Sequence, residues 1–376
     1  MRFCASVPVL FLVLLVQPVA AQTTAAGKVE PPLRVAVVGL VHGHVSGFLQ
    51  ANRKRADIEI VGIAELDAEL AARLAKKYNL APELMFADAE VMLKKTKPQA
   101  VLAYTNTFDH RSVVELCAKH GVHVMMEKPL AVSLEDGLVM EKAAVEGKIH
   151  VLVNYETTWY RSNRAAFDLV RDNALGDVRK IVVHDGHRGP KEIGCGPEFL
   201  GWLTDPKLNG AGALFDFGCY GADLATWLLE GRRPSTVTAI TQQIKPHIYP
   251  RVDDEATVVL TYPKTQVIIQ ASWNWPFDRK DMEVYGETGS AFTVRQNEIR
   301  VRRARGKEEF VTAKALPSPH DDPVTFLRAV VNGTAKPDGL SSLDTNLIVA
   351  EILDAARQSA ASGKTVTLPA KRAVAK

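Results

Sequence analysis

The sequence has few cysteines, little net charge and no long apolar run beyond its first residues, and each shortage excludes a class of protein. Four cysteines without metal-type spacing among 376 residues predict neither a disulfide-stapled fold nor any metal site. A formal net charge of +3 is too small to indicate a nucleic-acid partner. What remains is a globular chain whose length predicts two domains.

The first 21 residues have the order of a secretory signal peptide. One positive charge at Arg2 precedes an apolar run from Val7 to Val16, and small residues follow up to Ala21. The run is shorter than the roughly 20 residues of a membrane-spanning helix, although an uncleaved anchor is the alternative. We predict cleavage near Ala21, a linker over 22–32, and an exported mature protein, periplasmic or extracellular, with no membrane contact.

Three cysteines remain after this cleavage, so at least one of them is unpaired. Cys117 lies inside a helical pattern and is predicted to be a core residue. A bridge between Cys195 and Cys219 stays open as an alternative.

The order of strands and helices divides the rest of the chain at about residue 156. Over 33–156, buried strands such as LRVAVVGL and QAVLAYT alternate with helical segments, which predicts βαβ units and a doubly wound parallel sheet. Over 157–368, strands separated by turns dominate, with few helices. This second region is predicted to be an α+β domain with a mainly antiparallel open sheet. The fold class is therefore α/β.

The first strand ends in a turn that partly matches a dinucleotide-binding motif. The turn reads GLVHGH over 39–44, so only the first glycine of G-x-G-x-x-G is in place. Val41 and His44 stand at the second and third glycine positions. Such a turn lets the backbone approach a pyrophosphate, and we predict NAD contacts from Gly39, Leu40, His42 and Gly43. A turn that binds no dinucleotide is the alternative.

A carboxylate follows this turn at the spacing that a dinucleotide fold requires. Glu65 comes 26 residues after Gly39, at the end of the second predicted strand. A carboxylate at this place binds the hydroxyls of the adenosine ribose, and it favours NAD over NADP because it repels the 2′-phosphate.

A second motif, Glu127-Lys128-Pro129, follows a later strand. The proline stiffens the turn and places Lys128 at the carboxyl edge of the parallel sheet, where open α/β folds bind their ligands. The alternative is a solvated surface lysine beside a turn.

Two segments together resemble the Gfo/Idh/MocA family of oxidoreductases. That family has a T-P-N-x-x-H motif after one strand and E-K-P after the next, and here Thr105 and His110 match while Asn106 and Thr107 depart from it. GAGALFDFGCYGADLATWLLEG resembles the family segment of the second domain. The resemblance covers nearly all of 33–368. It implies an N-terminal NAD-binding Rossmann domain and a substrate-binding, oligomerising second domain.

The resemblance also implies which residues carry the chemistry. Lys128, Asp216 and Tyr220 correspond to the family's catalytic positions, with tyrosine at a place where histidine is usual. Thr105, Asn106, His110 and Glu127 join the first turn and Glu65 as predicted cofactor contacts. Family members commonly form oligomers, so a homo-oligomer is expected.

The catalytic prediction has a simple acid–base reason. Oxidising an alcohol needs a proton acceptor, and a tyrosine serves at neutral pH only if a cation lowers its pKa. We predict that Lys128 does this for Tyr220 and that Asp216 orients the pair or holds a substrate hydroxyl. The alternative for Tyr220 is an ordinary core residue.

The predicted function is that of an exported NAD-dependent oxidoreductase acting on a sugar, polyol or glycoside. Two alternatives stay open: a cofactor-free binding protein, and a non-redox enzyme that cleaves a glycoside through transient oxidation.

Overall fold

A computed structural model describes residues 31–51 and 55–369 of the chain. The predicted signal peptide and its cleavage site lie outside the described residues, so both stay predictions. Within these two described ranges, no helix combines the length and apolarity that crossing a membrane requires.

The first sheet is parallel and forms the N-terminal half of the described chain. Its strands follow the order β3-β2-β1-β4-β5-β6, so the strand order reverses between β1 and β4. Their bounds are β1 Leu33–Val38, β2 Ile58–Ala64, β3 Met85–Phe86, β4 Ala100–Ala103, β5 His123–Glu127 and β6 Val151–Asn154. Ligands of such sheets bind where the order reverses, at the carboxyl ends of the strands.

Helices connect these strands, and polar side chains cap the N-termini of several of them. Asp67 accepts hydrogen bonds from the N–H groups of Glu69 and Leu70, and Ser133 accepts one from Asp136. The connecting helices are α1 His44–Ala51, α2 Ala68–Tyr78, η2 Pro82–Leu84, α3 Ala89–Thr96, α4 His110–Lys119 and α5 Leu134–Gly147. The sheet and these helices form the predicted Rossmann domain.

The second sheet is mostly antiparallel, with the order β14-β13-β12-β11-β7-β10-β9-β8-β15 and one parallel pair, β7 with β10. Its strands are β7 Val178–Gly186, β8 Thr236–Gln242, β9 Glu255–Thr261, β10 Gln266–Ser272, β11 Arg279–Gly286, β12 Gly289–Arg295, β13 Glu298–Arg303, β14 Glu309–Thr312 and β15 Val366–Thr367. The predicted fold class, a parallel sheet followed by a mainly antiparallel one, is confirmed.

Short helices before β8 build the part of the second domain that faces the site. They are η3 Glu156–Trp159, α6 Arg161–Arg171, α7 Pro197–Leu203, α8 Pro206–Asn209, α9 Ala213–Asp216 and α10 Gly218–Leu228. Phe217 separates α9 from α10, so Asp216 ends one helix and Tyr220 lies in the first turn of the next.

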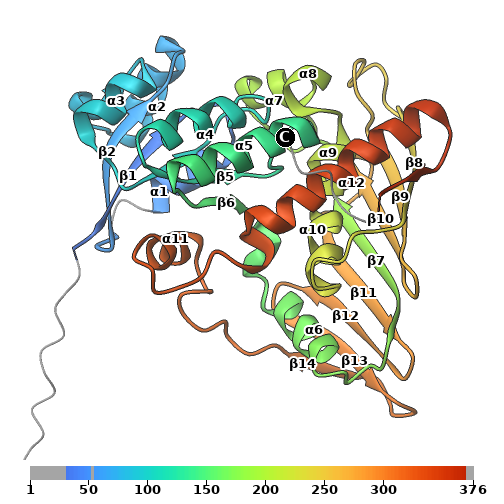
Figure 1. Cartoon of the computed structure of the whole chain (residues 1–376). Helices are drawn as coiled ribbons and strands as arrows, with labels where there is room; N and C mark the ends of the chain where they lie inside the picture. Colours follow the sequence, from blue (N-terminus) through green and yellow to red (C-terminus); the bar gives the residue numbers. More distant parts are fainter. Residues whose placement is uncertain (1–30, 52–54, 370–376) are drawn as a thin grey trace, which may run out of the picture. The chain divides into compact units, whose positions relative to one another are not determined.

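The C-terminal helices return to the first sheet, which differs from the predicted division of the chain at residue 157. They are α11 Pro323–Val331, η4 Gly339–Ser341 and α12 Leu343–Ser362. Phe326 and Leu327 of α11 lie in one apolar core with Val35 and Val37 of β1. Helix α12, red in Figure 1, packs against both α5 and β8. Apolar faces on both helices drive this return, because each must be covered.

Candidate active site

Lys128 lies directly after β5, and its ammonium group is buried. Its side chain is 7% exposed, and Nζ donates hydrogen bonds to Asp216 Oδ1 at 2.5 Å and to the Asp216 carbonyl oxygen at 2.7 Å. This burial rules out the alternative of a solvated surface lysine. The first sheet and the second domain thus meet through a charged pair at the strand edge where ligands bind.

Asp216 is held from two sides. Trp273, which is fully buried, donates its indole Nε1–H to Asp216 Oδ2 at 2.9 Å. Burial raises the pKa of Asp216, but the charge and hydrogen bond of Lys128 act together with His187 and the Trp273 indole, so that the net shift of the pKa is downward. Burial lowers the pKa of Lys128, but Asp216, with smaller effects from Cys219 and Glu127, makes the net shift upward. Both groups are therefore charged at neutral pH.

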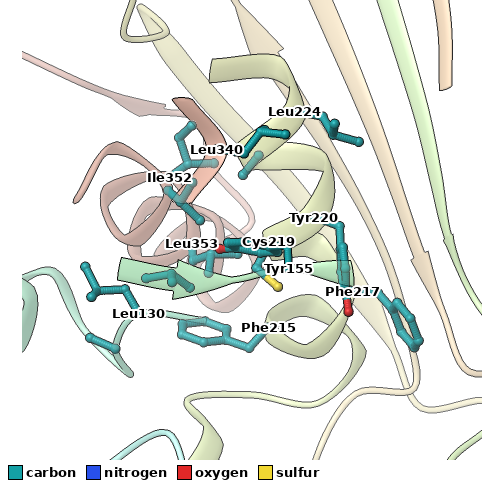
Figure 2. Close-up of a cluster of buried hydrophobic side chains, with 14 of the residues drawn as sticks. Leu130, Tyr155, Phe215, Phe217, Cys219, Tyr220, Leu224, Leu340, Ile352 and Leu353 are labelled. Atoms are coloured by element: carbon teal, nitrogen blue, oxygen red, sulfur yellow. The ribbon is translucent and has the colours of Figure 1, made fainter. Parts of the chain in front are cut away.

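Tyr220 lies beside this pair, and its ring faces the ammonium groups of Lys128 and Lys280. The Nζ atoms of Lys128 and Lys280 lie 4.9 and 5.2 Å from the ring centroid, and Tyr155 meets the ring edge-on at 5.4 Å. In Figure 2 the hydroxyl points away from Leu340 and Ile352. Among residues 31–51 and 55–369 this hydroxyl has no hydrogen-bond partner, and the side chain is 2% exposed.

The expectation that Lys128 lowers the pKa of Tyr220 is wrong in this structure. Burial raises the pKa of Tyr220 well above its usual value, and the nearby acidic groups add to the rise. Lys128 is neutralised by Asp216 and faces the ring, so its charge does not stabilise a phenolate. Tyr220 therefore keeps its proton at neutral pH and acts as a hydrogen-bond donor.

His110, a predicted cofactor contact, is buried against the segment that follows Lys128. Its side chain is buried, and Nδ1 lies 3.1 and 3.2 Å from the carbonyl oxygens of Pro129 and Leu130. These carbonyls belong to the segment that follows Lys128. His110 therefore braces the Glu127-Lys128-Pro129 turn from beneath.

The first turn uses several of its backbone donors within the protein. The N–H of Leu40 donates to Glu65 Oε2 at 2.6 Å, and the N–H of His42 donates to the Tyr104 carbonyl at 3.0 Å. Glu65 Oε1 accepts a further bond from the N–H of Asp67. Glu65 is thus turned toward the backbone, and a ribose would have to compete for its oxygens.

Other predicted cofactor residues have local roles in this structure. Gly39 has φ +80°, and a Cβ there would lie 2.6 Å from Thr105 Cγ2, so packing of β1 against the segment after β4 requires glycine. Asn106 pairs with both the N–H and the carboxylate of Asp109. The leucine side chain of residue 40 is buried in the core.

Residues of α7 cover the first turn. Trp202 donates its Nε1–H to the Val41 carbonyl at 3.3 Å, and the Phe199 ring meets the buried His42 ring edge-on at 5.1 Å. The ring of Phe199 also lies 3.9 Å from where a Cβ of Gly43 would stand. The fit to a dinucleotide therefore varies along the crevice: the cluster around Lys128 suits hydride chemistry, whereas in the turn the N–H groups of Leu40 and His42 are already used within the protein.

Glu127 points toward the same turn from the end of β5. Its Oε2 lies 3.0 Å from His44 Nδ1, and its Oε1 accepts a 3.1 Å bond from Asn154 Nδ2. Glu127 and His44 also line a cavity of about 590 Å³ between α1, α11 and the ends of β4 and β5. A ligand in this cavity reaches the residue next to Lys128.

Two charged residues of the site carry no sequence signal and were missed. Asp185 of β7 and Lys280 of β11 are cross-strand partners, and the Lys280 ammonium also pairs with Glu156. Neither carboxylate oxygen of Asp185 has a hydrogen-bond partner in the described part of the chain. Only the register of two strands almost 100 residues apart brings these groups together, and a single sequence does not reveal that register.

We predict that Asp185→Asn stabilises the protein near neutral pH. Burial raises the pKa of Asp185 well above its ordinary value, with Lys280 opposing in part. A folded-state pKa above the unfolded value means that folding takes up a proton, so wild-type stability falls as pH rises from about 4, by at most about 1.4 kcal/mol per pH unit. Urea unfolding between pH 4 and 8 measures this slope. Identical slopes for wild type and variant would contradict it.

The three cysteines in the described residues, Cys117, Cys195 and Cys219, are free thiols. The open alternative of a bridge between Cys195 and Cys219 is therefore not realised. Cys117 is buried in the core, as predicted.

Both halves of the chain match models of one protein family. Residues 33–155 match the oxidoreductase family with an NAD-binding Rossmann fold, and residues 163–292 match the GFO/IDH/MocA C-terminal domain. A trans-1,2-dihydrobenzene-1,2-diol dehydrogenase of Xenopus tropicalis is 29% identical over 229 residues, which are 57% of this chain and 61% of that relative. The D-glucoside 3-dehydrogenase of Escherichia coli K12 is 28% identical over 201 residues, 53% and 54% of the two chains.

The chain thus spans less than two thirds of the length of these relatives. Solved structures match it more completely in fold. An inositol dehydrogenase homologue of Azotobacter vinelandii with NAD⁺ has a TM-score of 0.78 at 18% identity, covering 91% of this chain and 98% of that one. The aldose-aldose oxidoreductase of Caulobacter crescentus with glycerol has a TM-score of 0.76 at 20% identity, covering 90% and 100%. With both of its domains matched, this chain belongs to the Gfo/Idh/MocA family of oxidoreductases.

Proposed function

We propose that this protein is an NAD-dependent oxidoreductase that acts on a hydroxyl-bearing carbon of a sugar, polyol or glycoside. The observation that carries the proposal is the buried cluster of Lys128, Asp216 and Tyr220. Two charged groups and a free phenol hydroxyl meet at the strand edge where the family holds its substrate. Such a cluster has no evident use in a purely structural core, because burying a charged pair rarely stabilises a fold.

The protonation states of the cluster define what it does. A bound nicotinamide would accept or supply the hydride, and the protein handles the proton. Lys128 and Tyr220 both hold protons at neutral pH, so they donate hydrogen bonds to a substrate oxygen and stabilise negative charge on it. Asp216 keeps the ammonium in place. This state delivers a proton to a carbonyl oxygen in the reductive direction, and in the oxidative direction the same groups take up the proton that leaves the substrate hydroxyl.

A carbohydrate-like substrate is supported by the relatives and by the polar groups around the cluster. One relative is named for a D-glucoside, and the two solved structures are named for an aldose and for inositol. Lys280 lies over the Tyr220 ring, pairs with Glu156 and is the cross-strand partner of Asp185, so further groups that bond hydroxyls lie near the cluster. A substrate rich in hydroxyls satisfies such a site, whereas an apolar one leaves it unpaired.

Nucleotide binding tests the cofactor part of the proposal. In calorimetric titrations of the purified chain we expect NADH to bind roughly tenfold more tightly than NADPH, because the carboxylate of Glu65 repels a 2′-phosphate. The matched variant Glu65→Gln keeps an acceptor for the N–H of Leu40 and removes the charge, so the preference should shrink. Equal binding of the two nucleotides to wild type would contradict this role of Glu65.

One observation favours a second candidate, a cofactor-free binding protein. The first turn donates the N–H groups of Leu40 and His42 within the protein, and α7 covers it. If neither nucleotide binds in the titration while a carbohydrate does, the binding protein is the better account.

We also propose that the protein is exported and that it forms a homo-oligomer. The order of residues 1–21 supports export through a cleaved signal peptide. Membership of the family supports a homo-oligomer. Native mass spectrometry of the secreted protein reports the mature N-terminus, the subunit number and any retained nucleotide in one measurement.

A further inference from the structure

Three potential metal ligands meet between the first turn and the end of β5. One ligand atom each from His42, His44 and Glu127 lies within 4.8 Å of the other two. The pair of His44 Nδ1 and Glu127 Oε2 is already at 3.0 Å. The sequence predicted no metal site, because the carboxylate stands more than 80 residues from the two histidines and only the parallel sheet unites them.

The donor set is that of a transition-metal site. Two imidazoles and one carboxylate bind zinc and related divalent ions, and sites with three protein ligands keep a further position open. His42 Nδ1 accepts only a long bond, 3.2 Å, from the N–H of His44. Ligation through that nitrogen exchanges this weak bond for a metal bond.

The surroundings hold the ligands in place. Asn154 donates to Glu127 Oε1, and the Trp159 indole donates to Asn154 Oδ1 at 3.0 Å, which leaves Glu127 Oε2 directed at the histidines. Phe199 packs edge-on against His42. Supporting contacts of this kind orient the ligands of metal sites.

The cluster is also reachable from solvent. The His44 side chain is 51% exposed, whereas that of Glu127 is 3% exposed, and both line the cavity of about 590 Å³. An ion can therefore enter from the cavity, and its open position faces space that holds a water molecule or an oxygen of a ligand.

We propose that His42, His44 and Glu127 bind one divalent transition-metal ion such as Zn²⁺ or Co²⁺. Metal–ligand bonds of about 2.1 Å require the three ligand atoms to close to roughly 3.5 Å from one another. The His44–Glu127 pair already meets this limit, so His42 is the ligand that moves. His42 and Glu127 are also predicted cofactor contacts, so the metal site is tested on the nucleotide-free protein, where metal binding is measured apart from the proposed oxidoreductase function.

Titration of the metal-stripped, untagged full chain with Co²⁺ tests the site. We expect one equivalent to bind, with the visible absorption of cobalt in a nitrogen–oxygen ligand set. His44→Asn and Glu127→Gln should each weaken binding at least about 100-fold. Zn²⁺ should raise the melting temperature of wild type but not of these variants. Circular dichroism establishes that each variant is folded.

The matched control is His150→Asn. His150 stacks on His123 at 5.0 Å elsewhere in the first domain, so it is a second pair of neighbouring imidazoles without a carboxylate between them. Retained cobalt binding in this variant supports the proposal. Absence of cobalt absorption in wild type, binding that survives in folded His44→Asn and Glu127→Gln, or binding lost in His150→Asn would each overturn it.

Discussion

Replacing Lys128 by methionine is expected to lower turnover by roughly 10³-fold or more and to destabilise the fold by about 3 kcal/mol. The turnover falls because the ammonium that stabilises charge on the substrate oxygen is lost. The fold weakens because Asp216 remains buried and, within residues 31–51 and 55–369, keeps only the Trp273 indole as a side-chain hydrogen-bond partner. Steady-state kinetics and urea unfolding measure the two effects on the same preparation.

A double variant separates these effects. Adding Asp216→Asn to Lys128→Met removes the orphaned charge and keeps an oxygen for the Trp273 indole, so most of the lost stability should return. Turnover should stay low, since Lys128 is still absent. Recovery of turnover together with stability would show that Lys128 serves the fold and not the reaction.

Tyr220→Phe is expected to lower turnover by roughly 100-fold while stability changes by no more than about 0.5 kcal/mol. The phenyl ring of the variant keeps the contacts with Tyr155, Lys128 and Lys280. Only the hydroxyl is removed, and it has no hydrogen-bond partner among the described residues. Turnover of wild type and variant, measured alongside thermal unfolding, reports both quantities.

Tyr155→Phe is the matched control for this variant. The Tyr155 hydroxyl donates to Asn346 Oδ1 at 2.9 Å in the core, so its loss should cost about 1–2 kcal/mol of stability and leave most of the turnover. The two tyrosine rings are neighbours, yet Tyr220→Phe is expected to lose turnover and keep stability, whereas Tyr155→Phe is expected to lose stability and keep turnover. If Tyr220→Phe turned over at the wild-type rate, the hydroxyl would have no part in the reaction.

Local features of the fold were predictable because local forces determine them. Asp67, Ser133 and Ser342 cap helices where their side chains satisfy free N–H groups, and Gly363 ends α12 in the left-handed region. The alternation of buried strands and helices is also set by local sequence patterns, and it predicted the first sheet. The return of α11 to that sheet was not predictable, since it depends on which distant apolar face it covers.

The candidate site was predictable only as far as motifs identify single residues. The motifs brought out Lys128, Asp216 and Tyr220, and the structure places all three together. They did not show that Lys128 is neutralised by Asp216, that His110 braces a turn, or that Glu65 bonds to backbone. Such pairings depend on how far apart helices and strands lie in the folded protein. The spacing of residues along the sequence does not give these distances.

The most direct test of the account follows a hydride in a single turnover. The protein is mixed with NAD⁺ and sugars, polyols or glycosides that carry deuterium on their hydroxyl-bearing carbons, and the nucleotide is analysed by mass spectrometry. We predict deuterium in the reduced nicotinamide for wild type and none for the Lys128→Met, Asp216→Asn double variant. A nucleotide that binds but gains no deuterium from any of these compounds, or equal transfer by the double variant, would contradict an oxidoreductase centred on Lys128.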